Sequence, residues 1–334
     1  MSKKSKSSGK LLVIKIVAVL CIIGLSLGFG FSQVGLDKII EADSVDDILA
    51  SAQDYIKDNF IDSKDSINQE SLESMQDLAE VDGELGIYYF DVGQADCTLV
   101  SCDGEYMLID AGNNEDGNLI VAQLISMGIS KVKYLIGTHP HEDHIGGLDD
   151  VLKNFEVENL YMPDIEYDSS TYRNVISAAK KSGVTSVAPK LGHIFYVGEA
   201  RCEIMGIDSD NEETNQTSII VETTHGKNKF LFMADAEIPN EEKRLWNDVD
   251  VLKVGHHGSS TSSSDDFLEQ TMPEVAVISC GEGNSYGHPH REVMAALKDS
   301  DVQIYRTDTQ GTIHVSSDGK TYEISTFDID LDGE

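Results

Sequence analysis

Three histidines and an aspartate stand close together in the segment THPHEDH, residues 138–144. His139, His141 and His144 each offer an imidazole nitrogen, and Asp143 offers a carboxylate. Imidazole and carboxylate groups together suit borderline divalent metal ions. His139 and His141 alternate by two and can face one ion, whereas Asp143 and His144 lie past the bend and can face another. The spacing therefore predicts a site for two metal ions.

Other candidate ligands also follow apolar runs that are typical of buried strands. Asp235 ends the run FLFMAD, where its carboxylate can bridge two ions, and His256 and His257 follow DVLKVG. Asp110 ends the run LID. The histidine-rich segment itself follows a run ending in LIG, which is typical of a central strand. Loops at strand ends present ligands well, but these ones converge only if their strands share one edge of the fold.

The elements that would position these residues occupy the region from residue 86 to about residue 325. Strand-like segments recur in both halves of it, with helix-like segments between them. This pattern predicts an α/β fold built as a four-layer αββα sandwich. In detail, it predicts a hairpin that turns at Gly226, a helix over residues 145–155 and a helix over residues 237–246.

The N-terminal part of the chain differs from this region in kind. Residues 1–10 are basic, and an apolar run fills residues 11–32, long enough at about 1.5 Å per residue to cross a hydrocarbon core of about 30 Å. We expect a transmembrane signal-anchor that leaves the basic tail in the cytoplasm, with cleavage and secretion as the alternative. Residues 33–82 are acidic and rich in serine, as in a solvated stalk. The domain would then span residues 83–334.

Eight motifs occur in order over residues 86–325: FDVGQADCTLV, LIDAG, THPHEDHIGG, NQTSIIVE, FMADAE, VLKVGHHGSSTS, ISCGEGNSYGHPH and RTDTQGTI. In type and order they resemble the metallo-β-lactamase-fold hydrolases. Within that family the similarity is greatest to the extracellular hydrolase domain of the ComEC competence proteins and to their stand-alone relatives. The resemblance implies two divalent metal ions, zinc or manganese, and a hydroxide that they activate.

The resemblance also implies which residues hold the metals. For the first ion the implied ligands are His139 and His141; for the second they are Asp143, His144 and one of His256 or His257; Asp235 would bridge the two. Many members of the wider family have a further histidine where this chain has Asn215. Because asparagine is a poor ligand for zinc and a tolerable one for oxygen-preferring ions, manganese is as plausible as zinc.

Two further residues gain implied roles. Asp110 would orient the ligand loop without touching a metal. His288, in YGHPH, could contact a leaving oxygen or a phosphate as a donor or general acid, or it could only fix the entry to the helix that follows. Together with Asp143 and His257, His288 completes the set of predicted catalytic residues.

The charge of the chain bears on its substrate. There are 25 Lys and Arg residues against 59 Asp and Glu residues, a formal net charge of -34. Such a surface repels polyanions, so a nucleic acid would have to be held locally. The candidates for that contact are Lys253, Arg291, Arg306 and the Ser/Thr run 259–264.

The ligand set alone does not select a substrate, because a di-metal site can open a lactam, a thioester or a phosphodiester. The resemblance favours a phosphodiesterase or nuclease outside the cell, acting on DNA or on an envelope phosphodiester. The acidity favours the smaller substrate. The alternative is a non-catalytic or weakly catalytic partner module in DNA uptake or envelope assembly.

Overall fold

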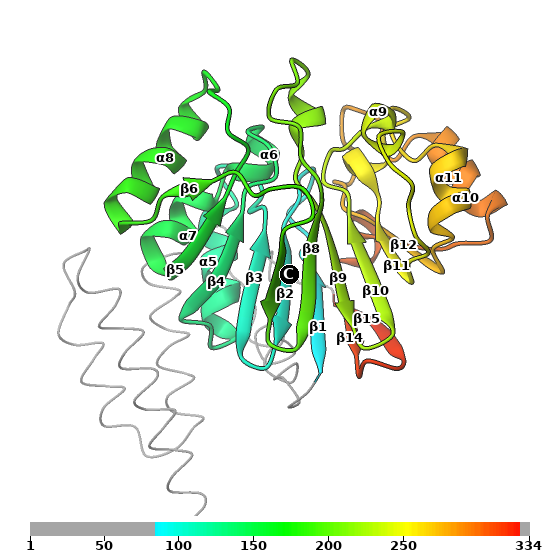
Figure 1. Cartoon of the computed structure of the whole chain (residues 1–334), viewed down its shortest axis with the longest axis horizontal. Helices are drawn as coiled ribbons and strands as arrows, with labels where there is room; N and C mark the ends of the chain where they lie inside the picture. The colour runs from blue at the N-terminus through cyan, green and yellow to red at the C-terminus, as the bar shows by residue number, and fades with distance from the viewer. Residues whose placement is uncertain (1–83, 328–334) are drawn as a thin grey trace, which may run out of the picture.

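Two β-sheets pack face to face, and helices cover the outer face of each (Figure 1). The structure is a computed structural model that describes residues 84–327. The predicted four-layer αββα sandwich is confirmed. The basic tail, the apolar run and the stalk predicted for residues 1–82 lie outside the described residues. Within residues 84–327, no helix is both long enough and apolar enough to cross a membrane.

The first sheet has eight strands in the order β15-β14-β1-β2-β3-β4-β5-β6. Strands β3 to β6 run parallel to one another, whereas the other neighbours are antiparallel. The strands are β1 (Leu85–Tyr89), β2 (Thr98–Cys102), β3 (Glu105–Ile109), β4 (Lys131–Ile136), β5 (Glu156–Tyr161), β6 (Ser186–Val187), β14 (Thr312–Ser317) and β15 (Tyr322–Phe327).

The second sheet has seven strands in the order β13-β12-β11-β10-β9-β8-β7. Strands β10 to β13 are parallel, and β9 and β10 form the predicted hairpin, which turns at Gly226. The strands are β7 (Ile194–Val197), β8 (Ala200–Gly206), β9 (Ile220–His225), β10 (Asn228–Phe232), β11 (Val251–Lys253), β12 (Val275–Ile278) and β13 (Gln303–Arg306).

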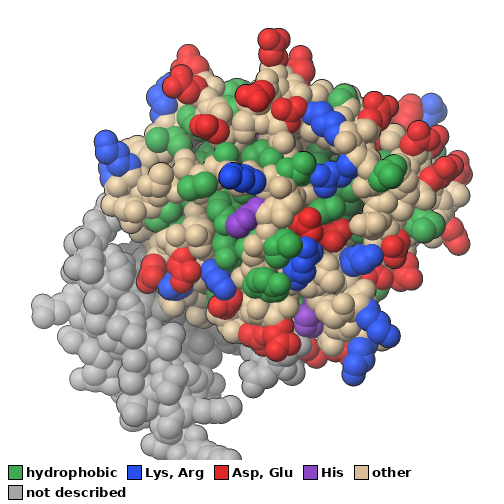
Figure 2. Space-filling model, in the orientation of Figure 1, with side chains coloured by type: hydrophobic (Ala, Val, Ile, Leu, Met, Phe, Trp, Pro, Cys, Tyr) green, Lys and Arg blue, Asp and Glu red, His purple; other side chains and the backbone are tan. Residues whose placement is uncertain are grey.

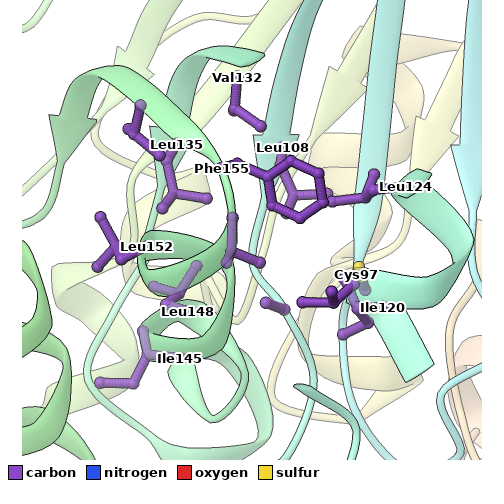
Figure 3. Close-up of a cluster of buried hydrophobic side chains, with 14 of the residues drawn as sticks. Cys97, Leu108, Ile120, Leu124, Val132, Leu135, Ile145, Leu148, Leu152 and Phe155 are labelled. Carbon is purple, nitrogen blue, oxygen red and sulfur yellow. The ribbon is translucent and has the colours of Figure 1, made fainter. Parts of the chain in front are cut away.

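The helices divide between the two outer faces. On the first sheet lie α5 (Gly117–Ser126), α7 (Leu148–Asn154) and α8 (Ser170–Ser182); on the second lie α10 (Asp265–Thr271) and α11 (Arg291–Asp299). Leu124 and Leu148 pack with Leu108 and Leu135 of the first sheet (Figure 3). Shorter turns are α6 (Glu142–Ile145), α9 (Ile238–Glu241), α12 (Thr307–Gln310) and the 3-10 turns η1 (Thr214–Thr217) and η2 (Gly255–Gly258).

The side chains of β1 show why the strands are apolar on both faces. Ile87 and Tyr89 point into the core between the sheets, where Tyr89 lies 6.1 Å from Phe232 of the other sheet, ring centre to ring centre. Tyr88 belongs instead to the core under the helices. Alternate residues of a strand face opposite sides, so a sheet covered on both sides needs apolar residues at both.

Two predicted helices are wrong in extent. The helix predicted over residues 145–155 begins only at Leu148, as α7, because Ile145 ends the separate turn α6 and Gly146 and Gly147 lie between the two. A Cβ atom on Gly146 would lie only 2.1 Å from the backbone of Asn113, so this point of the chain serves close packing. The helix predicted over residues 237–246 ends at Glu241, whose backbone carbonyl accepts a hydrogen bond of 2.7 Å from the indole of Trp246.

Candidate metal centre

The candidate ligands follow the carboxyl ends of parallel strands and gather at one edge of the sandwich. Asp110 follows β3, the segment 138–144 follows β4, Asp235 follows β10, and His256 and His257 follow β11. Parallel neighbours end on the same side of a sheet, and the pairs β3·β4 and β10·β11 are both parallel. The convergence that the sequence required is therefore present.

Four of these residues form a tight group. Asp143, His144, Asp235 and His257 each place one candidate ligand atom within 4.8 Å of all the others. Nε2 of His144 lies 3.2 Å from Oδ1 of Asp235, and Nε2 of His257 lies 3.3 Å from Oδ2 of Asp143.

Within this group the geometry fits a divalent cation. Nε2 of His144, Nε2 of His257 and Oδ1 of Asp235 are buried and have no hydrogen-bond partner among the described residues. Buried polar atoms are nearly always satisfied, so three orphaned atoms around one point call for a positive charge there. Two imidazoles and two carboxylates are also a usual donor set for zinc or manganese.

The opposite ring nitrogens of both histidines are held by other groups. Nδ1 of His144 lies 2.7 Å from Oδ2 of Asp110, whose carboxylate also accepts hydrogen bonds from the backbone and hydroxyl of Thr138. Nδ1 of His257 lies 3.1 Å from the backbone oxygen of Ser279. Such partners fix the ring and leave Nε2 for a metal.

A looser group surrounds the other oxygen of Asp235. Oδ2 of Asp235 lies 3.8 Å from Nε2 of His139 and 3.5 Å from Nε2 of His256. Nε2 of His139 also lies 3.1 Å from Nδ1 of His141. The structure therefore places His257 in the tight group and His256 on the side of His139.

The backbone between these two histidines is unusual. His256 and His257 have φ values of 48° and 52°, which residues other than glycine rarely adopt. Their rings diverge, with planes 65° apart and centres 6.1 Å apart. Strained backbone of this kind collects at functional sites, where the surroundings hold it in place.

Asn215 and His288 lie beside these two groups. The amide nitrogen of Asn215, in η1, lies 3.3 Å from Nε2 of His256, and its buried Oδ1 has no hydrogen-bond partner in the described part of the chain. The ring of His288 is centred 5.6 Å from that of His256 and 6.1 Å from that of His257. Burial and these two neighbouring rings lower the pKa of His288 to about 4, so this ring is neutral near pH 7.

The sequence analysis missed a buried ion pair beneath the site. Asp96 lies 2.7 Å from Nζ of Lys253, and its Oδ1 lies 3.2 Å from Nδ1 of His257. Lys253 is only 2% exposed, so its prediction as a phosphate contact is wrong. Asp96 could have been recognised from its position just before a strand, inside the motif FDVGQADCTLV.

Of the other predicted cations, Arg291 is exposed, and its Nη2 lies 3.8 Å from Oε1 of Glu292. Arg306 forms an ion pair with Asp308, which lines a cleft of about 1220 Å³ next to Asp143. Among residues 84–327, seven acidic residues and no Lys or Arg line this cleft. Figure 2 shows acidic side chains along both the upper and the lower edges of the face in view, with some Lys and Arg side chains among them.

Charge around the tight group shapes the pKa of its histidines in the absence of metal. Burial acts to lower the pKa of His257, but Asp235 and Asp96 outweigh it and raise the pKa to about 10. The pKa of His144 is likewise raised well above its usual value, because Asp235 and Asp110 outweigh burial. Without metal, both rings are therefore in the positively charged imidazolium form at pH 7.

Metal binding should consequently release protons. A ligand nitrogen must be deprotonated, so filling the tight group at pH 7 is expected to displace about two protons, one each from His144 and His257. The affinity should then rise about a hundredfold per pH unit between pH 6 and pH 8. Calorimetry with manganese in buffers of different ionisation enthalpy measures the proton count directly. A binding enthalpy that is the same in every buffer would contradict the assignment of these two rings.

Comparison with known proteins agrees with this geometry. The family model described as Metallo-beta-lactamase superfamily matches residues 90–282. ComE operon protein 3 of Bacillus subtilis is 28% identical over 67% of this chain and 32% of that protein. Recombination protein 2 of Haemophilus influenzae is 32% identical over 68% of this chain and 28% of its own length. Competence protein ComA of Neisseria gonorrhoeae is 27% identical over 70% of this chain and 32% of its own length. The chain thus spans about a third of the length of these relatives.

Proposed function

Because the chain belongs to the metallo-beta-lactamase superfamily, we propose that it is a metal-dependent hydrolase that cleaves phosphodiesters. The observation that carries the proposal is the set of three buried, unpartnered atoms around one point: Nε2 of His144, Nε2 of His257 and Oδ1 of Asp235. Burying polar atoms without hydrogen-bond partners costs free energy, so three such atoms at one point indicate a binding site.

Each residue of the centre has a part in this proposal. Asp143, His144 and His257 would hold one divalent ion, and Asp235, which lies between the two groups, would serve both ions. Three residues on the other side of Asp235 would hold the second ion: His139, His141 and His256. When bound, zinc or manganese supplies a hydroxide near neutral pH and stabilises developing negative charge. Asp110 and Asp96 orient the rings of His144 and His257, and Asn215 offers an oxygen beside His256.

Two observations bear on the substrate. The relatives carry the names of recombination and competence proteins, which favours DNA. The acidic cleft beside Asp143 opposes an extended polyanion, because the described part of the chain lines it with seven carboxylates and no cation. A small phosphodiester, such as one from the cell envelope, reaches the metals without crossing that surface. His288, neutral near pH 7, serves as a hydrogen-bond donor to the substrate rather than as a strong acid.

A panel of substrates tests the proposal. With manganese, the full chain is expected to cleave bis-p-nitrophenyl phosphate, and to cleave linear DNA more slowly. DNA binding without metal should be negligible, and with metal its affinity should fall only shallowly with salt, because few counterions are released. Hydrolysis of a β-lactam or an ester, with every phosphodiester untouched, would overturn the substrate class. Inertness toward the whole panel at full metal content would favour a non-catalytic module in DNA uptake or envelope assembly.

The proposal includes a location. Residues 11–32 form a single apolar run after a basic segment, which favours an anchor in the cell membrane with the hydrolase domain outside the cytoplasm. Protease added to intact cells should therefore remove residues 83–334. Complete protection in intact cells, together with digestion after lysis, would place the domain on the inner side instead.

A further inference from the structure

Gln94 joins two loops that both border the candidate metal centre. Its side-chain oxygen accepts a hydrogen bond of 3.1 Å from the backbone N–H of Gly281. Its side-chain nitrogen lies 3.3 Å from Nδ1 of His288. Gln94 and Tyr286 also line the cleft that contains Asp143, so this contact lies at the border between that cleft and the candidate metal centre.

These two contacts together determine which nitrogen of His288 carries the proton. Gly281 can only donate, so the oxygen of Gln94 must face it, and the amide NH₂ must then face His288. An amide nitrogen is a donor only, so Nδ1 of His288 is the acceptor. In a neutral imidazole the proton then resides on Nε2. Among the described residues, Nε2 of His288 has no hydrogen-bond partner.

The position of the ring is fixed as firmly as its tautomer. The side chain of Asn284 donates to the backbone oxygen of His288 at 2.6 Å and accepts from its backbone nitrogen at 3.0 Å. A Cβ atom on Gly281 would lie 2.7 Å from the backbone nitrogen of Gln94, so glycine lets the two loops dock. The ring is thereby held beside those of His256 and His257.

We propose that Gln94 is a positioning residue that holds His288 in the Nε2–H tautomer, so that this N–H donates a hydrogen bond to the leaving oxygen of a phosphodiester. This inference rests on the proposed function. The hydroxide oxygen forms a bond to phosphorus, and the bond from phosphorus to the leaving oxygen breaks, its electron pair remaining on that oxygen. His288 stabilises the resulting negative charge and keeps its proton, and the leaving alcohol takes a proton from water.

A neutral donor of this kind matters more for a poor leaving group. A p-nitrophenolate leaves readily without help, whereas the alkoxide of a dinucleoside phosphate carries nearly a full charge. Loss of one donor to a developing oxyanion costs about a hundredfold or more in kcat. We therefore expect His288→Ala to lower kcat about a hundredfold for a dinucleoside phosphate and only a few-fold for bis-p-nitrophenyl phosphate. Manganese content should be unchanged.

Gln94→Glu is the informative variant at the other position. It is nearly isosteric and can still accept from Gly281, but its second oxygen cannot donate and would favour the Nδ1–H tautomer. In the full chain we expect Gln94→Glu to reproduce the loss of His288→Ala in kcat, with little change in KM. Gln94→Ala frees the ring without favouring either tautomer, so its loss should be smaller. The double variant of Gln94 and His288 should be no slower than His288→Ala alone, because the two residues act as one unit.

A second measurement separates this inference from the proposed function. Nitrogen-15 NMR of the histidine rings reports the tautomer of His288 whether or not the protein turns over a substrate. We expect Nε2–H in the wild-type protein and Nδ1–H in Gln94→Glu. Equal losses on the two diesters, or Nδ1–H in the wild type, would overturn the role of Gln94. A wild-type protein inert toward both diesters but with the expected tautomers would remove the phosphodiesterase and, with it, the catalytic use of the His288 N–H.

Discussion

Replacing Asp235 by alanine is expected to abolish hydrolysis while the fold remains largely intact. Asp235 lies between the two groups of candidate ligands, with Oδ1 3.2 Å from His144 and Oδ2 3.5 Å from His256. Loss of a residue that only supports a metal ligand lowers metal affinity or activity about 10–100-fold. Loss of a residue that serves both ions should lower them further. We expect a loss of more than about a thousandfold in kcat/KM, and elemental analysis should show less bound metal.

A matched aspartate supplies the control for this experiment. Asp168 is 99% exposed, and its one ion pair within the described residues is with the exposed Arg173, so Asp168→Ala should leave both activity and metal content unchanged. His141→Ala should also lose activity and metal, because His141 lies 3.1 Å from His139 on the side of the second ion. Undiminished turnover in Asp235→Ala or His141→Ala would rule out the proposed centre.

The sequence predicted that the candidate ligands gather at one edge because these residues lie in local patterns. His139, His141, Asp143 and His144 share one loop, and Asp235 directly follows an apolar run, so strand ends could be recognised without knowing how strands pair. Convergence at one edge then followed from the layered fold. Strand alternation predicted that fold correctly because both sheets are covered on both faces.

Contacts between the two sheets could not be predicted in the same way. Asp96 precedes β2 in the first sheet, and Lys253 ends β11 in the second, so their pairing depends on how the sheets pack. A lysine at the end of a short strand normally reaches solvent, so the sequence alone predicts a surface position for Lys253. The break at Gly146 has a similar cause, since helical periodicity does not reveal the approach of Asn113.

Removing the charge of Lys253 is expected to destabilise the metal-free protein strongly. Lys253 is 2% exposed, and its Nζ lies 2.7 Å from Asp96. Burial acts to raise the pKa of Asp96, but Lys253 and His257 outweigh it and hold the pKa well below its usual value. The carboxylate is therefore charged, and Lys253→Met leaves it buried with one partner fewer. Breaking a buried pair costs about 3–5 kcal/mol, which urea denaturation of the metal-free chain would measure.

The double variant Asp96→Asn with Lys253→Met tests whether charge is the cause. Without either charge, no carboxylate is left uncompensated, so the free energy of unfolding should recover by a large part of the loss seen in Lys253→Met. Metal should act in the same direction. Because a divalent ion near His257 supplies positive charge that Lys253→Met has lost, manganese should stabilise this variant more than it stabilises the wild type. Equal stability of Lys253→Met and the wild type without metal would show that the pair contributes no net electrostatic support. Recovery by the double variant without any extra response to manganese would confine the role of Lys253 to folding and separate it from the metal centre.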